Sequence, residues 1–180
     1  NMRIIAGTHK NRRIDFKNLN IRPTTNFAKE SLFNILNNHY DLQSTSILDL
    51  FAGSGNISYE FISRGCKDVV AVDNNIKCIK FIEKIKEKLD LQNLSIKLAN
   101  VNSFLKRIDT YYDIVFLDPP YYYKQEEYET LLNHIINQDM ITVNGMIIVE
   151  HSRFINFEKY DMFFSAKKYG RVHFTFLKNE

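Results

Sequence analysis

The sequence has 180 residues, a formal net charge of +3 and the apolar and charged fractions of a globular protein, so its composition argues against disorder. No apolar run approaches the roughly 20 residues that span a bilayer, which argues against a membrane partner. The N-terminal apolar stretch is too short for a signal peptide, so we expect a cytoplasmic protein. Asn1 precedes Met2, and we interpret it as an expression remnant.

The N-terminal region is predicted to form a small β-hairpin over residues 2–22. Ile4–Ala6 and Ile14–Phe16 are the expected strands, on either side of a basic loop over residues 8–13. Residues 23–25 break the chain at Pro23 and open a helix. The apolar face of that helix is expected to carry residues at spacings of three or four, namely Phe27, Ala28, Leu32, Ile35 and Leu36.

Short apolar strands then alternate with helices. We expect strands over 47–51, 69–73, 94–98, 114–117 and 146–149, with helices after Gly55 and over 76–89 and 125–137. The tail over 163–177 has a turn signal at Gly170 and indicates an antiparallel hairpin. This alternation predicts an α/β fold with a mostly parallel sheet covered on both faces. Cys66 and Cys78 have no partner at metal-ligand spacing, so we expect structural thiols and no metal site.

A glycine-containing turn follows the first strand of this alternation. Gly53 and Gly55 let the backbone turn tightly and approach a ligand closely, although a plain strand-to-helix turn would need the same residues. A dinucleotide site would have a third glycine at the position of Ser58, and the serine there weakens that interpretation without excluding it. Asp73 ends the second strand, where its carboxylate either accepts the hydroxyls of a ribose or caps the next helix. The two features together favour a nucleoside site.

The tetrad Asp118-Pro119-Pro120-Tyr121 directly follows the fourth strand. Ligands of open α/β sheets bind at the carboxyl ends of the strands. The two prolines fix the backbone and leave carbonyl groups free to accept hydrogen bonds. A carboxylate, a carbonyl and an aromatic ring then suit a flat base with an exocyclic amine, whereas the structural alternative is a rigid loop with a capping aspartate.

The order of these motifs resembles that of class I amino-methyltransferases, and the whole chain resembles the RsmD family of 16S ribosomal RNA guanine-N2 methyltransferases. The resemblance extends from the N-terminus to the tail, over Met2–Gly7, Arg22–Thr25, Ser31–Leu36, Leu48–Gly55, Asp118–Tyr121, Glu150–Ser152 and Tyr169–Gly170. It implies a Rossmann-like domain over 23–180 with a seven-stranded sheet, an antiparallel C-terminal hairpin and the hairpin over 2–22 as an extension.

The resemblance also implies S-adenosylmethionine as the cofactor. The residues expected to bind it are Asp49, Phe51, Gly53, Gly55 and Asp73, joined by Asn100, which stands where many class I methyltransferases carry aspartate. An asparagine can accept the hydrogen bond of an adenine amine through its side-chain carbonyl. Asp118, Pro119 and Tyr121 are expected to act on the base amine, and Pro120 to contact the base. Glu150 is left outside the catalytic group, as are the five histidines.

The implied partner is ribosomal RNA within an assembling small subunit, bound by a monomer. The expected RNA contacts are basic residues of the N-terminal region, namely His9, Lys10, Arg12, Arg13 and Arg22. Lys167, Lys168 and Arg171 in the tail fit an RNA contact or plain solvated charge equally well. Tyr122 and Tyr123 either line the base pocket or pack as a lid.

Three other functions compete with this one. Methylation of an adenine N6 in RNA or DNA would use the same tetrad, but the sequence has no separate domain for recognising a DNA target. A non-catalytic binding module is disfavoured because the tetrad at Asp118 is intact. A dehydrogenase is disfavoured by Ser58 and by the same tetrad.

Overall fold

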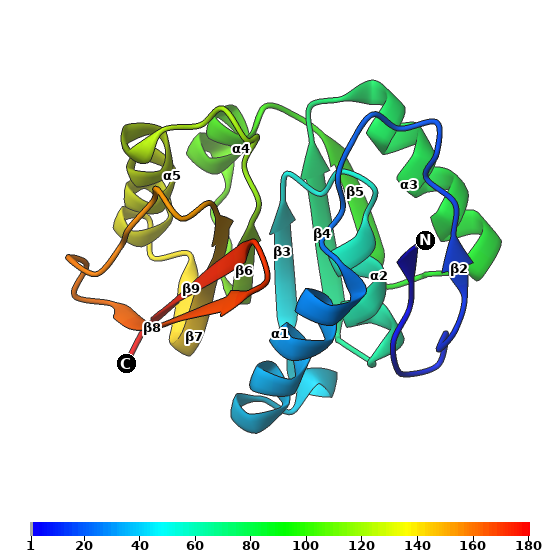
Figure 1. Cartoon of the computed structure of the whole chain (residues 1–180), viewed down its shortest axis with the longest axis horizontal. Coiled ribbons are helices and arrows are strands. Elements are labelled where there is room, and N and C mark those ends of the chain that lie inside the picture. Colours follow the sequence, from blue (N-terminus) through cyan, green and yellow to red (C-terminus); the bar gives the residue numbers. More distant parts are fainter. Residues whose placement is uncertain (1) are drawn as a thin grey trace.

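The computed structural model describes residues 2–180, and its centre is a seven-stranded sheet with helices on both faces (Figure 1). Asn1, which we interpret as an expression remnant, lies outside the described residues. The strand order is β5-β4-β3-β6-β7-β9-β8, and only β9 runs against its neighbours. The strands span Ser46–Leu50 (β3), Asp68–Asp73 (β4), Leu94–Leu98 (β5), Tyr112–Leu117 (β6), Ile141–His151 (β7), Phe163–Tyr169 (β8) and Val172–Lys178 (β9). The expected parallel sheet and its antiparallel C-terminal hairpin are confirmed.

Alternating side chains divide the core into two layers. Phe116 and Ile148 face one layer, whereas Val115 and Ile147 face the other, because successive strand residues point to opposite faces. Helices α1 (Asn26–His39), α2 (Asn56–Ser63) and α3 (Ile76–Leu89) cover the first face. Helices α4 (Val101–Arg107) and α5 (Gln125–Asn137) cover the second, and a short 3-10 turn, η1 (Leu42–Ser44), follows α1. Among residues 2–180, no helix is long and apolar enough to cross a membrane.

The apolar face of α1 differs from the expected one. Phe27 is 64% exposed, whereas Lys29 and Phe33 are wholly buried. Phe33 packs edge-on against Phe61 of α2, so the buried face of α1 is rotated toward α2. The two cysteines, Cys66 and Cys78, are free and buried, and burial raises the pKa of each thiol to about 11.

The N-terminal hairpin is shorter than expected and begins earlier. Its strands are Met2–Arg3 (β1) and Arg13–Ile14 (β2), with Met2 opposite Ile14. The expected strand at Ile4–Ala6 is wrong, and only Ile14 of the expected strand Ile14–Phe16 lies in β2. The backbone N–H groups of Ile5 and Ala6 instead donate to the Glu60 carboxylate at 2.8 and 3.1 Å. These two donors therefore bind α2 and cannot extend the hairpin.

Glu60 also holds a buried ion network between α1, α2 and the hairpin. Lys29 Nζ lies 3.3 Å from Glu60 Oε1, and both side chains are wholly buried. The same ammonium donates to the Arg3 carbonyl at 2.6 Å and to Asn56 Oδ1 at 2.7 Å. Arg64 Nε contacts Glu60 Oε2 at 2.8 Å. Burial lowers the pKa of Lys29, and the charge of Glu60 opposes that shift.

We expect Glu60→Gln to destabilise the protein strongly, because it leaves the buried ammonium of Lys29 without a countercharge. Breaking a buried pair in this way typically costs about 3–5 kcal/mol. The free energy of unfolding, measured in urea, should fall by this amount. The matched control is Glu129→Gln, which removes a pair with Lys159 whose lysine side chain is 66% exposed; its cost should stay below about 1 kcal/mol. Equal stabilities of the two variants would contradict the structural role of the network.

Candidate active site

Four acidic side chains lie at the carboxyl ends of four neighbouring strands. They are Asp73 of β4, Asp49 of β3, Asp118 after β6 and Glu150 of β7. Asp49 pairs with Ala71 and with Phe116 in the sheet register, and Leu117 pairs with Val149. Counting in steps of two from the buried residues of each strand places all four acidic residues on the face that α1, α2 and α3 cover.

The turn between β3 and α2 has three residues in the left-handed region. Phe51, Gly53 and Gly55 have φ values of 62°, 58° and 84°. A Cβ atom on Gly55 would lie 2.5 Å from the ring of Tyr59, so this position has no room for a side chain. A Cβ atom on Gly53 would make only ordinary contacts, with Ile21 at 3.6 Å and with the Phe51 carbonyl oxygen at 4.0 Å. The backbone of this turn can approach a ligand closely.

Asp73 joins this turn to β4. Its Oδ2 accepts a hydrogen bond from the Gly53 N–H at 2.9 Å, and its Oδ1 accepts one from the Asn75 N–H at 2.9 Å. The cap of α3 is Asn75, whose Oδ1 accepts from the N–H groups of Lys77 and Cys78. The capping interpretation of Asp73 is therefore wrong. Each oxygen of its carboxylate retains acceptor capacity for a ligand hydroxyl.

Asp49 is a buried carboxyl directly beneath the glycine turn. It is 1% exposed, and Ser58 Oγ donates a 2.6 Å hydrogen bond to its Oδ2. Burial raises the pKa of Asp49 to about 7, opposed by the Ser58 hydrogen bond and reinforced by the charges of Asp73 and Glu150. Ser58 occupies the position of the third glycine of a dinucleotide site, and here its hydroxyl binds the Asp49 carboxyl.

Asp118 and Glu150 form a half-buried acidic pair at the ends of β6 and β7. Burial raises the pKa of Asp118 well above its ordinary value, and the charges of Glu150 and Asp49 add to the shift. Burial also raises the pKa of Glu150 to about 7, against a hydrogen bond of 2.6 Å that Thr24 Oγ1 donates to Glu150 Oε1. Sequence reasoning left Glu150 outside the catalytic group. The signal that could have found it is the two-residue period Met146, Ile148, Glu150 along β7.

The tetrad presents its aromatic ring to solvent. Pro119 is buried and Pro120 is half-buried. Tyr121 is 98% exposed and touches Tyr122 edge-on, with ring centroids 5.6 Å apart. Tyr123 instead packs against Phe51 and Tyr128, in the core layer of α5. Tyr122 stays 64% exposed beside Tyr121.

Asn100 follows β5 and caps α4. Its Oδ1 accepts a hydrogen bond from the Ser103 N–H at 3.1 Å. The side chain is exposed, and its oxygen can accept a second hydrogen bond. The neighbouring Ala99 N–H donates to the Asp73 carbonyl at 3.0 Å, so Asn100 lies at the same strand-end edge as Asp73.

The basic residues of the N-terminal region form an exposed set. Lys10, Arg12, Arg13 and Arg22 are exposed, and within residues 2–180 none of the four has an acidic group within 4.0 Å. His9 is half-buried, and its backbone N–H donates to Ser63 Oγ at 2.9 Å. The hydrogen bonds to α2 thus hold the basic loop in place.

The basic turn of the tail approaches the start of α1. Tyr169, beside Lys168, touches Phe27 with ring centroids 5.8 Å apart. The turn between β8 and β9 is therefore close in space to the segment that carries Arg22, although the two lie at opposite ends of the chain.

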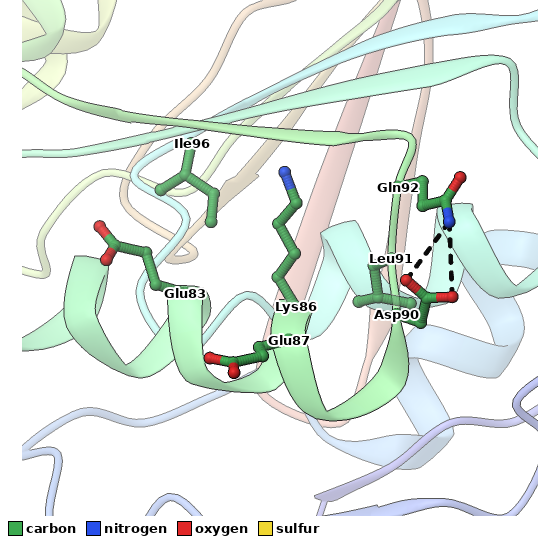
Figure 2. A pocket seen from close by; sticks show the side chains of 7 residues that line it. All are labelled: Glu83, Lys86, Glu87, Asp90, Leu91, Gln92 and Ile96. Atoms are coloured by element: carbon green, nitrogen blue, oxygen red, sulfur yellow. Dashed lines mark hydrogen bonds between the residues drawn. The ribbon is translucent and has the colours of Figure 1, made fainter.

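A separate pocket of about 430 Å³ lies where α3 leads into β5. Figure 2 shows that its lining is mostly charged and that Gln92 donates to Asp90 across one side of it. None of the four strand-end acidic residues lines this pocket, so it is distinct from the candidate active site. Its residues are Glu83, Lys86, Glu87, Asp90, Leu91, Gln92 and Ile96.

Known proteins resemble this chain along nearly its whole length. The family model described as "Conserved hypothetical protein 95" matches residues 2–178. A "Ribosomal RNA small subunit methyltransferase D" of Buchnera aphidicola is 35% identical over 156 residues, which cover 86% of this chain and 78% of that protein. The "Putative rRNA methyltransferase YlbH" of Bacillus subtilis is 34% identical over 84% of this chain and 83% of its own length.

Solved structures agree with the sequence relatives. The "Putative methyltransferase yhhF" of Escherichia coli superposes with a TM-score of 0.86 at 26% identity, covering 99% of this chain and 98% of that one. The expected Rossmann-like methyltransferase fold is therefore confirmed. With a family model that matches almost every residue and relatives above 30% identity, the chain belongs to the "Conserved hypothetical protein 95" family, the family of the ribosomal RNA small subunit methyltransferase D proteins.

Proposed function

We propose that this protein transfers a methyl group from S-adenosylmethionine to the exocyclic N2 amine of a guanine in 16S ribosomal RNA. The observation that carries the proposal is the position of Asp118-Pro119-Pro120-Tyr121, which follows β6 beside the glycine turn of β3. Membership of a family whose relatives bear ribosomal RNA methyltransferase names supports the substrate class.

The charges at the strand ends suit this cofactor. Asp49, Asp118 and Glu150 all have pKa values raised by desolvation, and among residues 2–180 no cation pairs with them. A positively charged ligand would favour their ionised forms. Asp73 would accept the ribose hydroxyls, the backbone from Phe51 to Gly55 would line the amino-acid portion, and Asn100 would accept from the adenine amine. When bound, the cofactor supplies a methyl group on a positively charged sulfur.

The tetrad would then prepare the base. An aromatic amine is a weak nucleophile because its lone pair is delocalised into the ring. The Asp118 carboxylate and the Pro119 carbonyl would accept the two amine hydrogens, which favours a tetrahedral nitrogen with its lone pair directed at the methyl group. Tyr121 would stack on the base, and Pro120 would contact its edge. Catalysis would rest mainly on positioning and electrostatics.

The RNA would be recognised mostly by charge and shape. We assign residues 2–22 to an RNA-binding extension and residues 23–180 to the methyltransferase domain. The free cations Lys10, Arg12, Arg13 and Arg22, with His9 beside them, would contact phosphates. The target base must be unpaired or turned out of its stack, at about a few kcal/mol. We further propose that a monomer acts in the cytoplasm on a partly assembled small subunit.

Mass spectrometry of modified nucleosides tests the base and the substrate together. The protein is incubated with S-adenosylmethionine and either naked 16S RNA or partly assembled subunits. N2-methylguanine, formed faster on the assembled particle, is the expected product. N6-methyladenine would instead favour the other amino-methylation, and no product on either substrate would refute the proposed activity.

The ribose assignment predicts that Asp73→Ala weakens cofactor binding. Losing a charged hydrogen-bond acceptor typically costs about 1.5–3 kcal/mol, or roughly 10- to 150-fold in Kd. Isothermal calorimetry with S-adenosylmethionine measures the loss. Asp68→Ala at the opposite end of β4 is the matched control and should bind as wild type. Wild-type affinity of a folded Asp73→Ala variant would refute the assignment.

The basic hairpin predicts a change in salt dependence. Replacing both Arg12 and Arg13 by glutamine should weaken RNA binding. The slope of the logarithm of the RNA-binding constant against the logarithm of the salt concentration should become shallower by about 0.7–0.9 per lost phosphate contact. Cofactor affinity should stay unchanged. Lys84→Gln with Lys88→Gln removes two exposed charges of α3 as the control. If both double variants lower the slope equally, net charge rather than the hairpin determines RNA binding.

The tetrad predicts a loss of rate without loss of cofactor. Asp118→Asn keeps the shape but can present an N–H to the amine, so the single-turnover rate should fall roughly 10²–10³-fold. Cofactor affinity, measured alongside, should change much less than the rate. Tyr121→Ala should also weaken base capture, since stacking on an aromatic ring contributes about 1–3 kcal/mol. Methylation by Asp118→Asn within about threefold of wild type would contradict the assigned role.

A further inference from the structure

Asp118 and Glu150 differ in their hydrogen bonds although they stand side by side. They follow Leu117 and Val149, which are paired in the register of β6 and β7. Glu150 Oε1 accepts the 2.6 Å hydrogen bond of Thr24 Oγ1. Within residues 2–180 the Asp118 carboxyl accepts no hydrogen bond. A donated hydrogen bond stabilises the charged form of a carboxyl, so negative charge is more favourable on Glu150 than on Asp118.

Within the described residues 2–180, no cation forms an ion pair with Asp118 or Glu150. The ionisable groups that face the pair are Asp49 from β3 and Tyr128 from α5. Burial raises the pKa of both, and neighbouring acidic groups add to the shift. Lys29 lies two hydrogen bonds from Thr24, since it donates to Asn56 Oδ1 and Asn56 Nδ2 donates to the Thr24 carbonyl. Its ammonium is already engaged by Glu60. Two half-buried carboxylates that lack a cation disfavour simultaneous ionisation.

We propose that Asp118 and Glu150 share a single proton, and that Glu150, held by Thr24, is a positioning residue that governs when Asp118 can accept the amine. In the free protein the proton resides mainly on Asp118, whose neutral carboxyl donates rather than accepts. A cation entering the site favours loss of that proton, and the Asp118 carboxylate then accepts the amine hydrogens. This gating role rests on the proposed function.

Methyl transfer is completed when the methylated nitrogen loses a proton to Asp118. The N–C bond forms as the C–S bond breaks, and the electron pair of the C–S bond stays on sulfur. The nitrogen becomes an ammonium and passes its proton to the Asp118 carboxylate. The pair then releases that proton to water, and the products are the methylated amine, the neutral sulfide and one proton.

Proton release on ligand binding tests the sharing without requiring any RNA. Calorimetry near pH 7 in buffers of different ionisation enthalpy counts the protons released by S-adenosylmethionine and by S-adenosylhomocysteine, which lacks the sulfonium charge. Wild type should release more protons with the sulfonium ligand. Glu150→Gln should reduce this excess, because removing the Glu150 charge lowers the pKa of Asp118, while burial and the Asp49 charge still raise it. The same excess in both proteins would overturn the proposal.

The pH dependence of single-turnover methylation tests the gate. In Glu150→Gln the acid limb of the pH–rate profile should move about one pH unit or more toward lower pH. A shift of about one unit corresponds to a tenfold gain in ionised Asp118 at acidic pH. Thr24→Val, which removes the donor to Glu150, should shift the limb in the same direction, and Thr24→Ser should restore it. Rates that fall equally at every pH, with the limb unmoved, would show a merely structural role and overturn the proposal. If wild type methylates no RNA, the proposed function fails, while the calorimetric result still decides on the shared proton.

Discussion

The buried pair between Glu60 and Lys29 is the interaction on which the arrangement of this protein depends. A charge removed from water must be paired and hydrogen-bonded, so each partner recruits further groups. Glu60 binds the backbone of Ile5 and Ala6, and Lys29 binds the Arg3 carbonyl. A short hairpin with only two paired residues per strand would not be stable alone, and these bonds hold it against α2.

The same polar groups lead from the hairpin to the strand ends. Lys29 binds Asn56, Asn56 binds the Thr24 backbone, and the Thr24 hydroxyl binds Glu150. Within residues 2–180, no lysine or arginine forms an ion pair with the acidic residues of the candidate site. An acidic, partly desolvated edge suits a cationic ligand, whereas the exposed, unpaired arginines suit a polyanion.

The local spacing of apolar residues along the sequence was enough to predict most of the parallel sheet. The helix over 125–137 and the strand over 94–98 have the predicted bounds, because apolar spacing reflects which face an element buries. Helix α4 was missed, since seven residues offer too little periodicity. The hairpin strands were misplaced because Ile5 and Ala6 bond to a side chain 54 or more positions away. Long-range bonds of this kind leave no trace in local spacing.

The sequence by itself determined the order of the glycine turn, Asp73 and the tetrad at Asp118, and the fold places all three at one edge because parallel strands end together. Only the tertiary structure decided that Glu150 joins Asp118, that Asn75 and not Asp73 caps α3, and that Ser58 binds Asp49. It also decided that Lys29 is buried while Phe27 is exposed. The physical reason is that a polar group's role depends on which distant partner satisfies it, and folding alone selects that partner.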